Sequence, residues 1–136
     1  MTVQLSVAVR NARLDAIETT VGASAILKIR SGAQPANCAT ADSGSVLATL
    51  NLPSDYMAAA SSGSKAKNGT WEDTSADATG TAAHWRLYAS DGTTCHAQGS
   101  ITATGGGGDD MTVDPTSFTS GQAFTVTAFS LTDGNA

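Results

Sequence analysis

The sequence is poor in charged and aromatic residues. Charged residues make up 14% of the 136 residues and aromatic residues 5%, and the seven Lys and Arg side chains form no dense cluster. With a net charge of -5, the chain lacks a basic surface for phosphates, so we expect no nucleic acid and no membrane as partners. No apolar run approaches the roughly 18 residues of a membrane span. The N-terminus lacks the basic start and apolar stretch of a signal peptide, which predicts assembly in the cytoplasm.

Cysteine is also scarce, with only Cys38 and Cys95 in the chain. In a reducing cytosol we expect two free thiols. A disulfide between them would need Cα atoms within about 7 Å, and the sequence does not give that distance. The two histidines, His84 and His96, are the other candidate soft-metal ligands, but their spacing fits no zinc-site pattern. We therefore expect His84 and His96 to be solvent-facing side chains and not metal ligands.

The sequence has no recognisable catalytic motif. The glycine run 105–108 is not followed by the Lys-Ser or Lys-Thr of a phosphate-binding loop, so we expect a flexible surface loop there. No serine lies in a Gly-x-Ser-x-Gly elbow. The spacing of Asp109, Asp110 and Asp114 matches no calcium loop. We therefore predict a protein that is not an enzyme, with no catalytic residue, no metal and no cofactor.

The N-terminal part of the chain carries one helical pattern, over residues 6–21. Its apolar residues recur at helical spacing, and Gly22 lies where a residue of positive φ commonly ends a helix. Arg10 lies within the apolar stripe, with its head group either in water or in an ion pair between subunits. We expect this helix to need packing partners. The apolar members of the stripe are Val7, Leu14, Ile17 and Val21, and the candidate interface on the helix consists of Val7, Arg10, Leu14 and Ile17.

From residue 25 the period changes to two, which is typical of strands. Strands are predicted over 25–30 and 46–52, with a long loop over 31–44 between them. In the last strand, residues 123–131, the apolar positions change face, so either a bulge lies near Ala128 or both faces are buried. The chain is thus predicted to be a single domain over 1–136, mainly β. We expect a β-sandwich or jelly-roll-like fold over about 25–132 with one N-terminal α-helix.

A hairpin is predicted within residues 77–101, and its pattern selects a register. Pairing residues whose numbers sum to 184 gathers the apolar side chains on one face, which requires a three- or five-residue loop around Asp91-Gly92-Thr93. The predicted core face contains Trp85, Leu87, Cys95, Ala97 and Ile101. The predicted outward face, a second candidate interface, contains His84, Arg86, Tyr88, His96 and Gln98.

The order of several segments resembles a family of small structural proteins of tailed bacteriophage virions. These segments are SVAVRNARLDAI at 6–17, LKIRSGAQP at 27–35, VLATL at 46–50, DTSADATGT at 73–81, WRLY at 85–88 and GQAFTV at 121–126. The resemblance covers nearly the whole chain, but it carries no catalytic motif. It implies a component of the particle, either a capsid decoration (cement) protein that stabilises the shell through contacts between subunits or a head-to-tail or tail component.

That resemblance implies a virion location and, as partners, the major capsid protein, other virion proteins and further copies of the chain. An alternative is a tail or collar component that binds a carbohydrate or receptor, for which we expect an exposed groove with Tyr56, Trp71 or Tyr88. A third interpretation is a small hydrolase that depends on Asp73 or Asp77.

Overall fold

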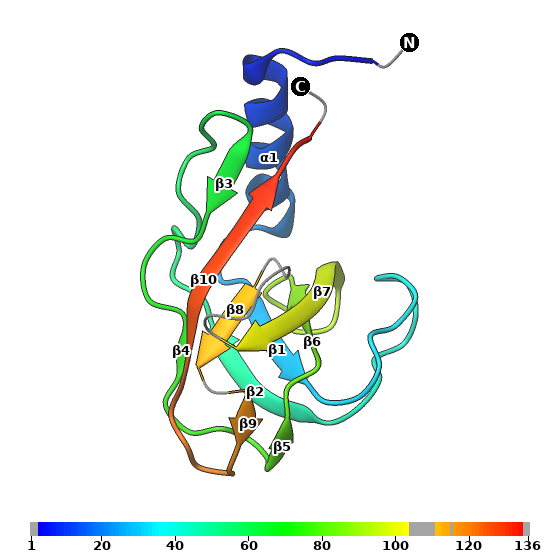
Figure 1. Ribbon diagram of the computed structural model, residues 1–136, viewed down its shortest axis with the longest axis vertical. Coiled ribbons are helices and arrows are strands. Elements are labelled where there is room, and N and C mark those ends of the chain that lie inside the picture. The colour runs from blue at the N-terminus through cyan, green and yellow to red at the C-terminus, as the bar shows by residue number, and fades with distance from the viewer. Residues whose placement is uncertain (1–2, 104–110, 115, 135–136) are drawn as a thin grey trace.

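The computed structural model describes residues 3–103, 111–114 and 116–134, and the predicted glycine loop lies outside this part of the chain. One helix, α1 (Val7–Val21), opens the fold, as predicted (Figure 1). The Ser6 hydroxyl accepts a hydrogen bond from the Val9 amide at 3.3 Å and caps the first turn. Gly22, with φ +85°, ends the helix and donates its amide to Glu18 O.

The rest of the described chain is mainly β, which confirms the predicted class. The principal sheet has the strand order β2-β1-β6-β7-β8-β10-β3, with β4 paired to β10, and a separate pair is formed by β5 and β9. Neighbours are antiparallel except β7 and β8, which are parallel. The strands are β1 (Ile26–Arg30), β2 (Val46–Asn51), β3 (Ser64–Ala66), β4 (Glu72–Asp73), β5 (Gly80–Thr81), β6 (His84–Tyr88), β7 (Cys95–Ala103), β8 (Met111–Asp114), β9 (Ser117–Phe118) and β10 (Phe124–Thr132).

The sheet curls around one core until its far strands meet. The Thr49 amide on β2 donates to Asp73 Oδ2 on β4 at 2.9 Å, which joins the first strand of the sheet to its last edge. Inside, Phe129 packs between Trp71 and Trp85, with ring centroids 5.3 and 5.1 Å apart. These large rings fill much of a core whose other members are mostly Ala, Val, Leu and Ile.

The hairpin of β6 and β7 follows the predicted register over most of its length. Trp85 pairs with Gly99 and Leu87 with Ala97, as predicted. The register then shifts by one, so that Tyr88 pairs with Cys95 and His96 is the extra residue of a bulge. The predicted pairing of Cys95 with Ala89, and its place on the core face, are therefore wrong.

The turn of this hairpin also differs from the prediction. The Ala89 amide donates to Thr94 O, so four residues, 90–93, separate the last bonded pair instead of three or five. The bulge at His96 compensates for this turn, because it restores the apolar face for the remainder of the strand.

The last strand contains a bulge near Ala128, which was one of the two alternatives that its pattern left open. Val126 pairs with Val113 and Ala128 with Thr112, so Thr127 is the inserted residue. The shift lets Phe124, Val126 and Phe129 all reach the core, where each is at most 3% exposed. A single inserted residue thus keeps the apolar side chains of β10 on one side.

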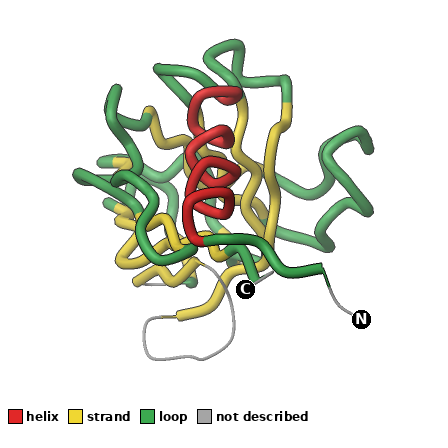
Figure 2. Tube along the Cα trace, turned by 90° about the horizontal axis from the view of Figure 1, so that it is seen from above, coloured by secondary structure: helices red, strands yellow, loops and turns green. Residues whose placement is uncertain are grey.

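A projection, here called the arm, lies at one end of the curled sheet (Figure 1). It consists of residues 3–6, helix α1, strand β3 and residues 130–134. Viewed from above, the helix lies over the strands (Figure 2). Lys65 of β3 is 3% exposed and links this strand to the helix. Its ammonium bonds Asp15 Oδ1 at 2.7 Å and Glu18 Oε2 at 3.0 Å on α1.

Candidate functional site

The predicted outward face of β6 is buried. His84, Arg86 and Tyr88 are 0, 1 and 0% exposed, which corrects the prediction that they form a solvent-facing stripe. Residues 31–45, which connect β1 to β2, supply the groups that bond these side chains. His96 alone of the predicted stripe is exposed, and Gln98 is half-buried, with its amide donating to Pro35 O at 2.6 Å.

Arg86 is the centre of the contact between this loop and the hairpin. Its Nη2 donates to the carbonyl oxygens of Asn37, Cys38 and Thr40 at 3.2, 3.0 and 3.1 Å. Its Nη1 donates to a carboxylate oxygen of Asp42. Three carbonyls that converge on one guanidinium fix the path of the loop, because each would otherwise need water.

Asp42 of the loop 31–45 neutralises the charges of Arg30 and Arg86. Its two oxygens accept from Tyr88 Oη at 2.7 Å and from Arg30 Nη2 at 2.8 Å, in addition to Arg86. Burial alone would raise the pKa of Asp42, but the hydrogen bonds from Tyr88 and Arg86 and the arginine charges outweigh it and hold the pKa below 3.8. The carboxylate is therefore ionised at neutral pH, and it balances two guanidinium groups that are almost inaccessible to water.

His84 lies at the other end of the same face. Its Nδ1 donates to Gly32 O at 3.0 Å, which ties the beginning of the loop to β6. Burial lowers the pKa of His84, and the nearby Arg30 and Arg86 charges lower it further. The folded protein therefore favours the neutral form of the His84 imidazole.

The cysteines meet where the loop crosses the hairpin. Cys38 of the loop and Cys95 of β7 are both half-buried free thiols, as expected, and their Sγ atoms are 2.9 Å apart. Cys95 lies on the loop side because of the bulge at His96, not in the core.

The helix stripe is divided between core and surface. Leu14 is 4% exposed and Ile17 is half-buried against the core, whereas Val7 is 48% exposed. Arg10 is half-buried, and its Nη1 donates to Asp133 O at 3.2 Å instead of reaching water. Of the four predicted helix contacts, Val7 is thus the one most open to a partner.

Two exposed apolar residues of the arm are additional to the predicted interface. Val3 and Val9 are 75 and 45% exposed, and with Val7 they are the large apolar side chains most open to solvent in the described chain. Val9 lies outside the predicted stripe because its side chain points away from Val7 around the helix. An apolar residue on the polar face of a predicted helix is the sequence signal that could have identified Val9 as an exposed contact residue.

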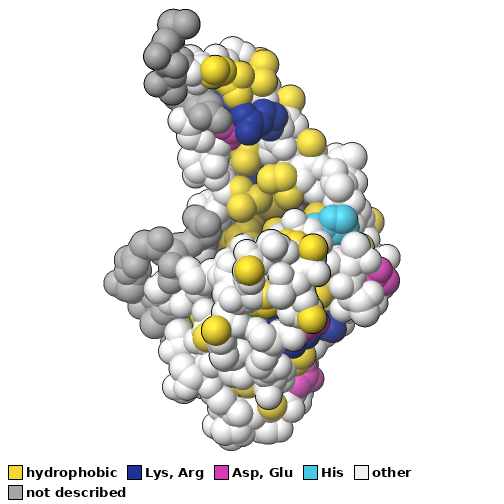
Figure 3. Space-filling model, turned by 90° about the vertical axis from the view of Figure 1, so that its right-hand side faces the viewer, with side chains coloured by type: hydrophobic (Ala, Val, Ile, Leu, Met, Phe, Trp, Pro, Cys, Tyr) yellow, Lys and Arg dark blue, Asp and Glu magenta, His cyan; other side chains and the backbone are white. Residues whose placement is uncertain are grey.

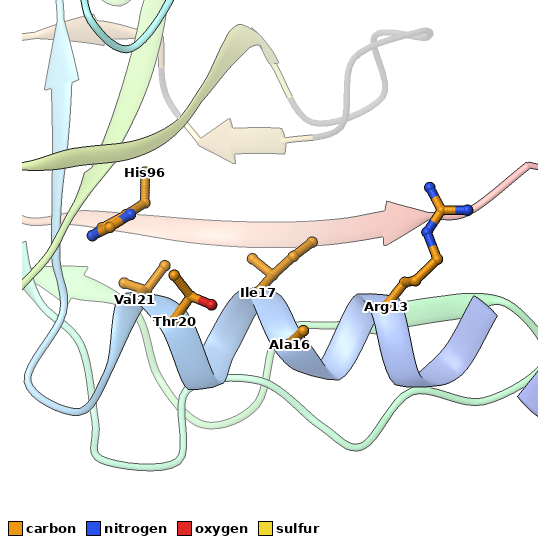
Figure 4. Close-up of a pocket in the computed structure, with 6 residues that line it drawn as sticks. All are labelled: Arg13, Ala16, Ile17, Thr20, Val21 and His96. Carbon is orange, nitrogen blue, oxygen red and sulfur yellow. The ribbon is translucent and has the colours of Figure 1, made fainter. Parts of the chain in front are cut away.

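An open hollow lies where the arm meets the body, and it brings together residues from the two predicted stripes. Ile17 and Val21 of α1 face His96 of β7 across it (Figure 4). A space-filling view shows hydrophobic side chains gathered at this junction, between the narrow arm and the wider body (Figure 3). The residues that line the hollow are Arg13, Ala16, Ile17, Thr20, Val21 and His96.

The aromatic residues expected in a glycan-binding groove are not at the surface. Tyr56 and Trp71 are each 1% exposed and Tyr88 is buried below the loop, which corrects that expectation. Trp71 Nε1 donates to Tyr56 O at 3.1 Å, so both rings are parts of the core. A sugar cannot stack on any of the three.

The acidic residues considered for hydrolysis have structural partners. Asp73 accepts from the Thr49 and Ser75 amides, each at 2.9 Å, and Asp77 accepts from the Thr49 hydroxyl at 2.7 Å. Within the described ranges no three His, Cys, Asp or Glu side chains are grouped so as to hold a metal ion. The helix of the described chain is too short and too polar to cross a membrane.

Comparisons with protein-family models, with curated proteins and with solved structures gave no match to this chain.

Proposed function

We propose that this chain is a non-enzymatic structural protein of a tailed-bacteriophage virion, a capsid decoration (cement) protein assembled in the host cytoplasm. Its partners are the major capsid protein or other virion proteins, together with further copies of itself. The observation that carries the proposal is the arm, which projects from the curled sheet (Figure 1). Its residues Val3, Val7 and Val9 are exposed to solvent.

Exposed valines near the end of a projection are suited to contact with another protein. Full burial of one such side chain contributes about 1.5 kcal/mol or more, so each of the three valines favours a contact that removes it from water. Leu14 and Val21 are the buried residues by which the helix packs on the rest of the protein. The exposed valines are therefore not needed for that packing. A shell lattice would gain interface area from the arm without any chemistry.

The body supports the same role through its rigidity. The loop 31–45 is fixed by Arg86, Asp42 and His84, and the sheet closes through Thr49 and Asp73. A cement subunit must transmit load between its neighbours without local unfolding, and a buried network of this kind resists such opening.

The alternative is a tail or collar component that binds a carbohydrate or receptor. With Tyr56, Trp71 and Tyr88 buried, this role would need a polar surface instead of aromatic stacking. The two roles differ in where the protein lies, so a gold label on the chain separates them: label over the shell supports cement, and label at the tail tip supports the alternative.

Binding to empty heads tests the proposed role directly. Purified chain is mixed with heads of the encoding phage that lack it and is sedimented, and light scattering gives its oligomeric state. We expect saturable binding that Val7→Asp with Val9→Asp reduces at least tenfold, without change in Tm. Ala36→Asp, at an exposed position of the body loop, is the matched control and should bind like the parent. A stable monomer that ignores heads would contradict the proposal.

A further inference from the structure

The two thiols of the chain lie in contact although they are 57 residues apart in sequence. The Cys38 and Cys95 sulfurs are separated by 2.9 Å, which is roughly 0.9 Å longer than a disulfide bond. Both residues are half-buried, so a small reagent has access to them. Bond formation needs the two sulfurs to move closer by about 0.9 Å.

The surrounding bonds hold the thiols in this position. The Cys38 carbonyl accepts from Arg86 Nη2 at 3.0 Å, and Asn37 Oδ1 accepts from the Ala39 and Thr40 amides at 2.9 and 3.0 Å. Cys95 is fixed in β7 by its pairing with Tyr88. Two sulfurs held by the fold on separate elements react with each other more readily than two sulfurs on a flexible chain.

From this geometry we infer that Cys38 and Cys95 form a redox modification site, at which a low-molecular-weight disulfide converts the dithiol into an internal disulfide that fastens loop 31–45 to the β6–β7 hairpin. The inference is independent of the proposed virion role. It assigns to the thiols a reaction with a specific class of oxidant.

The reaction is a pair of thiol–disulfide exchanges. Burial, together with the contact with Cys38, raises the pKa of the Cys95 thiol to about 11, so Cys95 keeps its proton at neutral pH until it reacts. Cys38 gives up its proton to solvent and its sulfur attacks one sulfur of the small disulfide, whose S–S bond breaks and releases one small thiolate. Cys95 then loses its proton to solvent and its sulfur attacks the Cys38 sulfur, displacing the second small thiolate. Two protein thiols are oxidised, and one small disulfide is reduced to two thiols.

The test uses the full chain in glutathione buffers of graded ratio, with alkylation and mass spectrometry as the readout. We expect an internal link between the peptides that contain Cys38 and Cys95. At fixed reduced glutathione, the folded chain should be half-oxidised at about 30-fold less oxidised glutathione than the chain in urea, because the fold holds the thiols together. The oxidised form should also have a Tm roughly 10 °C higher, and its loop amides should exchange more slowly.

The variants Cys38→Ser and Cys95→Ser are the matched controls. Each retains one thiol and should form no internal link while keeping the Tm of the reduced parent. Equal oxidation of the folded and the urea-unfolded chain would overturn the inference, as would glutathione retained on both cysteines. Disulfide-linked dimers in place of the internal link would overturn it too.

Discussion

At the scale of the residue, the Asp42 carboxylate is the counter-charge of two buried guanidinium groups. It neutralises Arg30 and Arg86, whose side chains are only 8 and 2% exposed. A buried guanidinium without a counter-charge is far more costly than one in water. Loss of this single carboxylate should therefore affect the whole contact between the loop and the hairpin.

The Asp42→Asn variant tests this role. Breaking a buried pair costs about 3–5 kcal/mol, but the Asp42 side chain is 37% exposed, so we expect a loss of about 2 kcal/mol in the free energy of unfolding. Urea denaturation at pH 7 measures it. Glu72→Gln, at an exposed carboxylate, is the control and should change stability by less than about 0.5 kcal/mol. Equal effects of the two substitutions would contradict the assigned role.

Protonation of His84 should make stability depend on pH. Its pKa in the folded state is lowered from 6.5, so the unfolded chain binds the proton first. The contribution is fully present above pH 6.5 and is lost as the pH falls toward the folded pKa. His84 Nε2 has no hydrogen-bond partner among the described residues, so a proton placed there finds no acceptor.

We therefore expect the free energy of unfolding to decrease when the pH is lowered from about 6.5 to 5. His84→Asn keeps a donor for Gly32 O and should flatten this decrease, whereas His96→Asn should preserve it. Urea titrations at several pH values provide the measurement. A decrease of the same size in the His84→Asn variant would show that another group causes it.

At the scale of the element, the arm depends on a buried lysine. Lys65 bonds Asp15 and Glu18 of α1 and also donates to Ala58 O at 2.9 Å. Hydrogen bonds from Lys65 and from the Ala60 amide lower the pKa of Asp15, which keeps this carboxylate ionised. The helix is thus held to β3 by charge, in addition to the burial of Leu14 and Val21.

Replacement of Lys65 by Met should loosen the helix and leave the sheet intact. We expect α1 amides to exchange hydrogen about tenfold faster, equivalent to roughly 1.4 kcal/mol of local stability, while amides of β1 and β6 keep their rates. Lys67→Met is the control, because its ammonium bonds only Gly69 O and lies over Trp71 in the described chain. Unchanged exchange in α1 would show that apolar packing alone holds the helix.

The hairpin depends on a glycine opposite a tryptophan. A Cβ at Gly99 would lie 2.7 Å from Trp85 Cζ2, closer than real carbon atoms approach, so the ring would have to move. We expect Gly99→Ala to cost about 1–3 kcal/mol in the free energy of unfolding. Gly134→Ala, where nothing lies within 4 Å, should leave the midpoint of thermal unfolding unchanged. A neutral Gly99→Ala would mean that Trp85 has room to shift.

At the scale of the whole molecule, periodicity predicted the parts of the fold that depend on neighbours along the chain. The helix, the β6–β7 register near Trp85 and the bulge in β10 are all encoded in which apolar residues share a face. These features depend on local spacing, and spacing is visible in a sequence.

The covered face of β6 could not be predicted in the same way. Polar side chains that alternate with apolar ones indicate a solvent-facing side unless distant groups satisfy them. For Arg86 these groups are Asp42 and three loop carbonyls, more than 40 residues away along the chain. The length of the loop 31–44 was the available signal, because a long loop in a small domain commonly packs on something.

The first helix and the last residues of the chain are direct partners. Arg10 donates to Asp133 O, and Arg13 lies 3.2 Å from Asp133 Oδ2. Ribosomes synthesise α1 well before Asp133, so the helix must wait for this contact until the intervening sheet has been made. A premature stop shortly before the Asp133 codon would therefore weaken a helix that is made long before that codon is read.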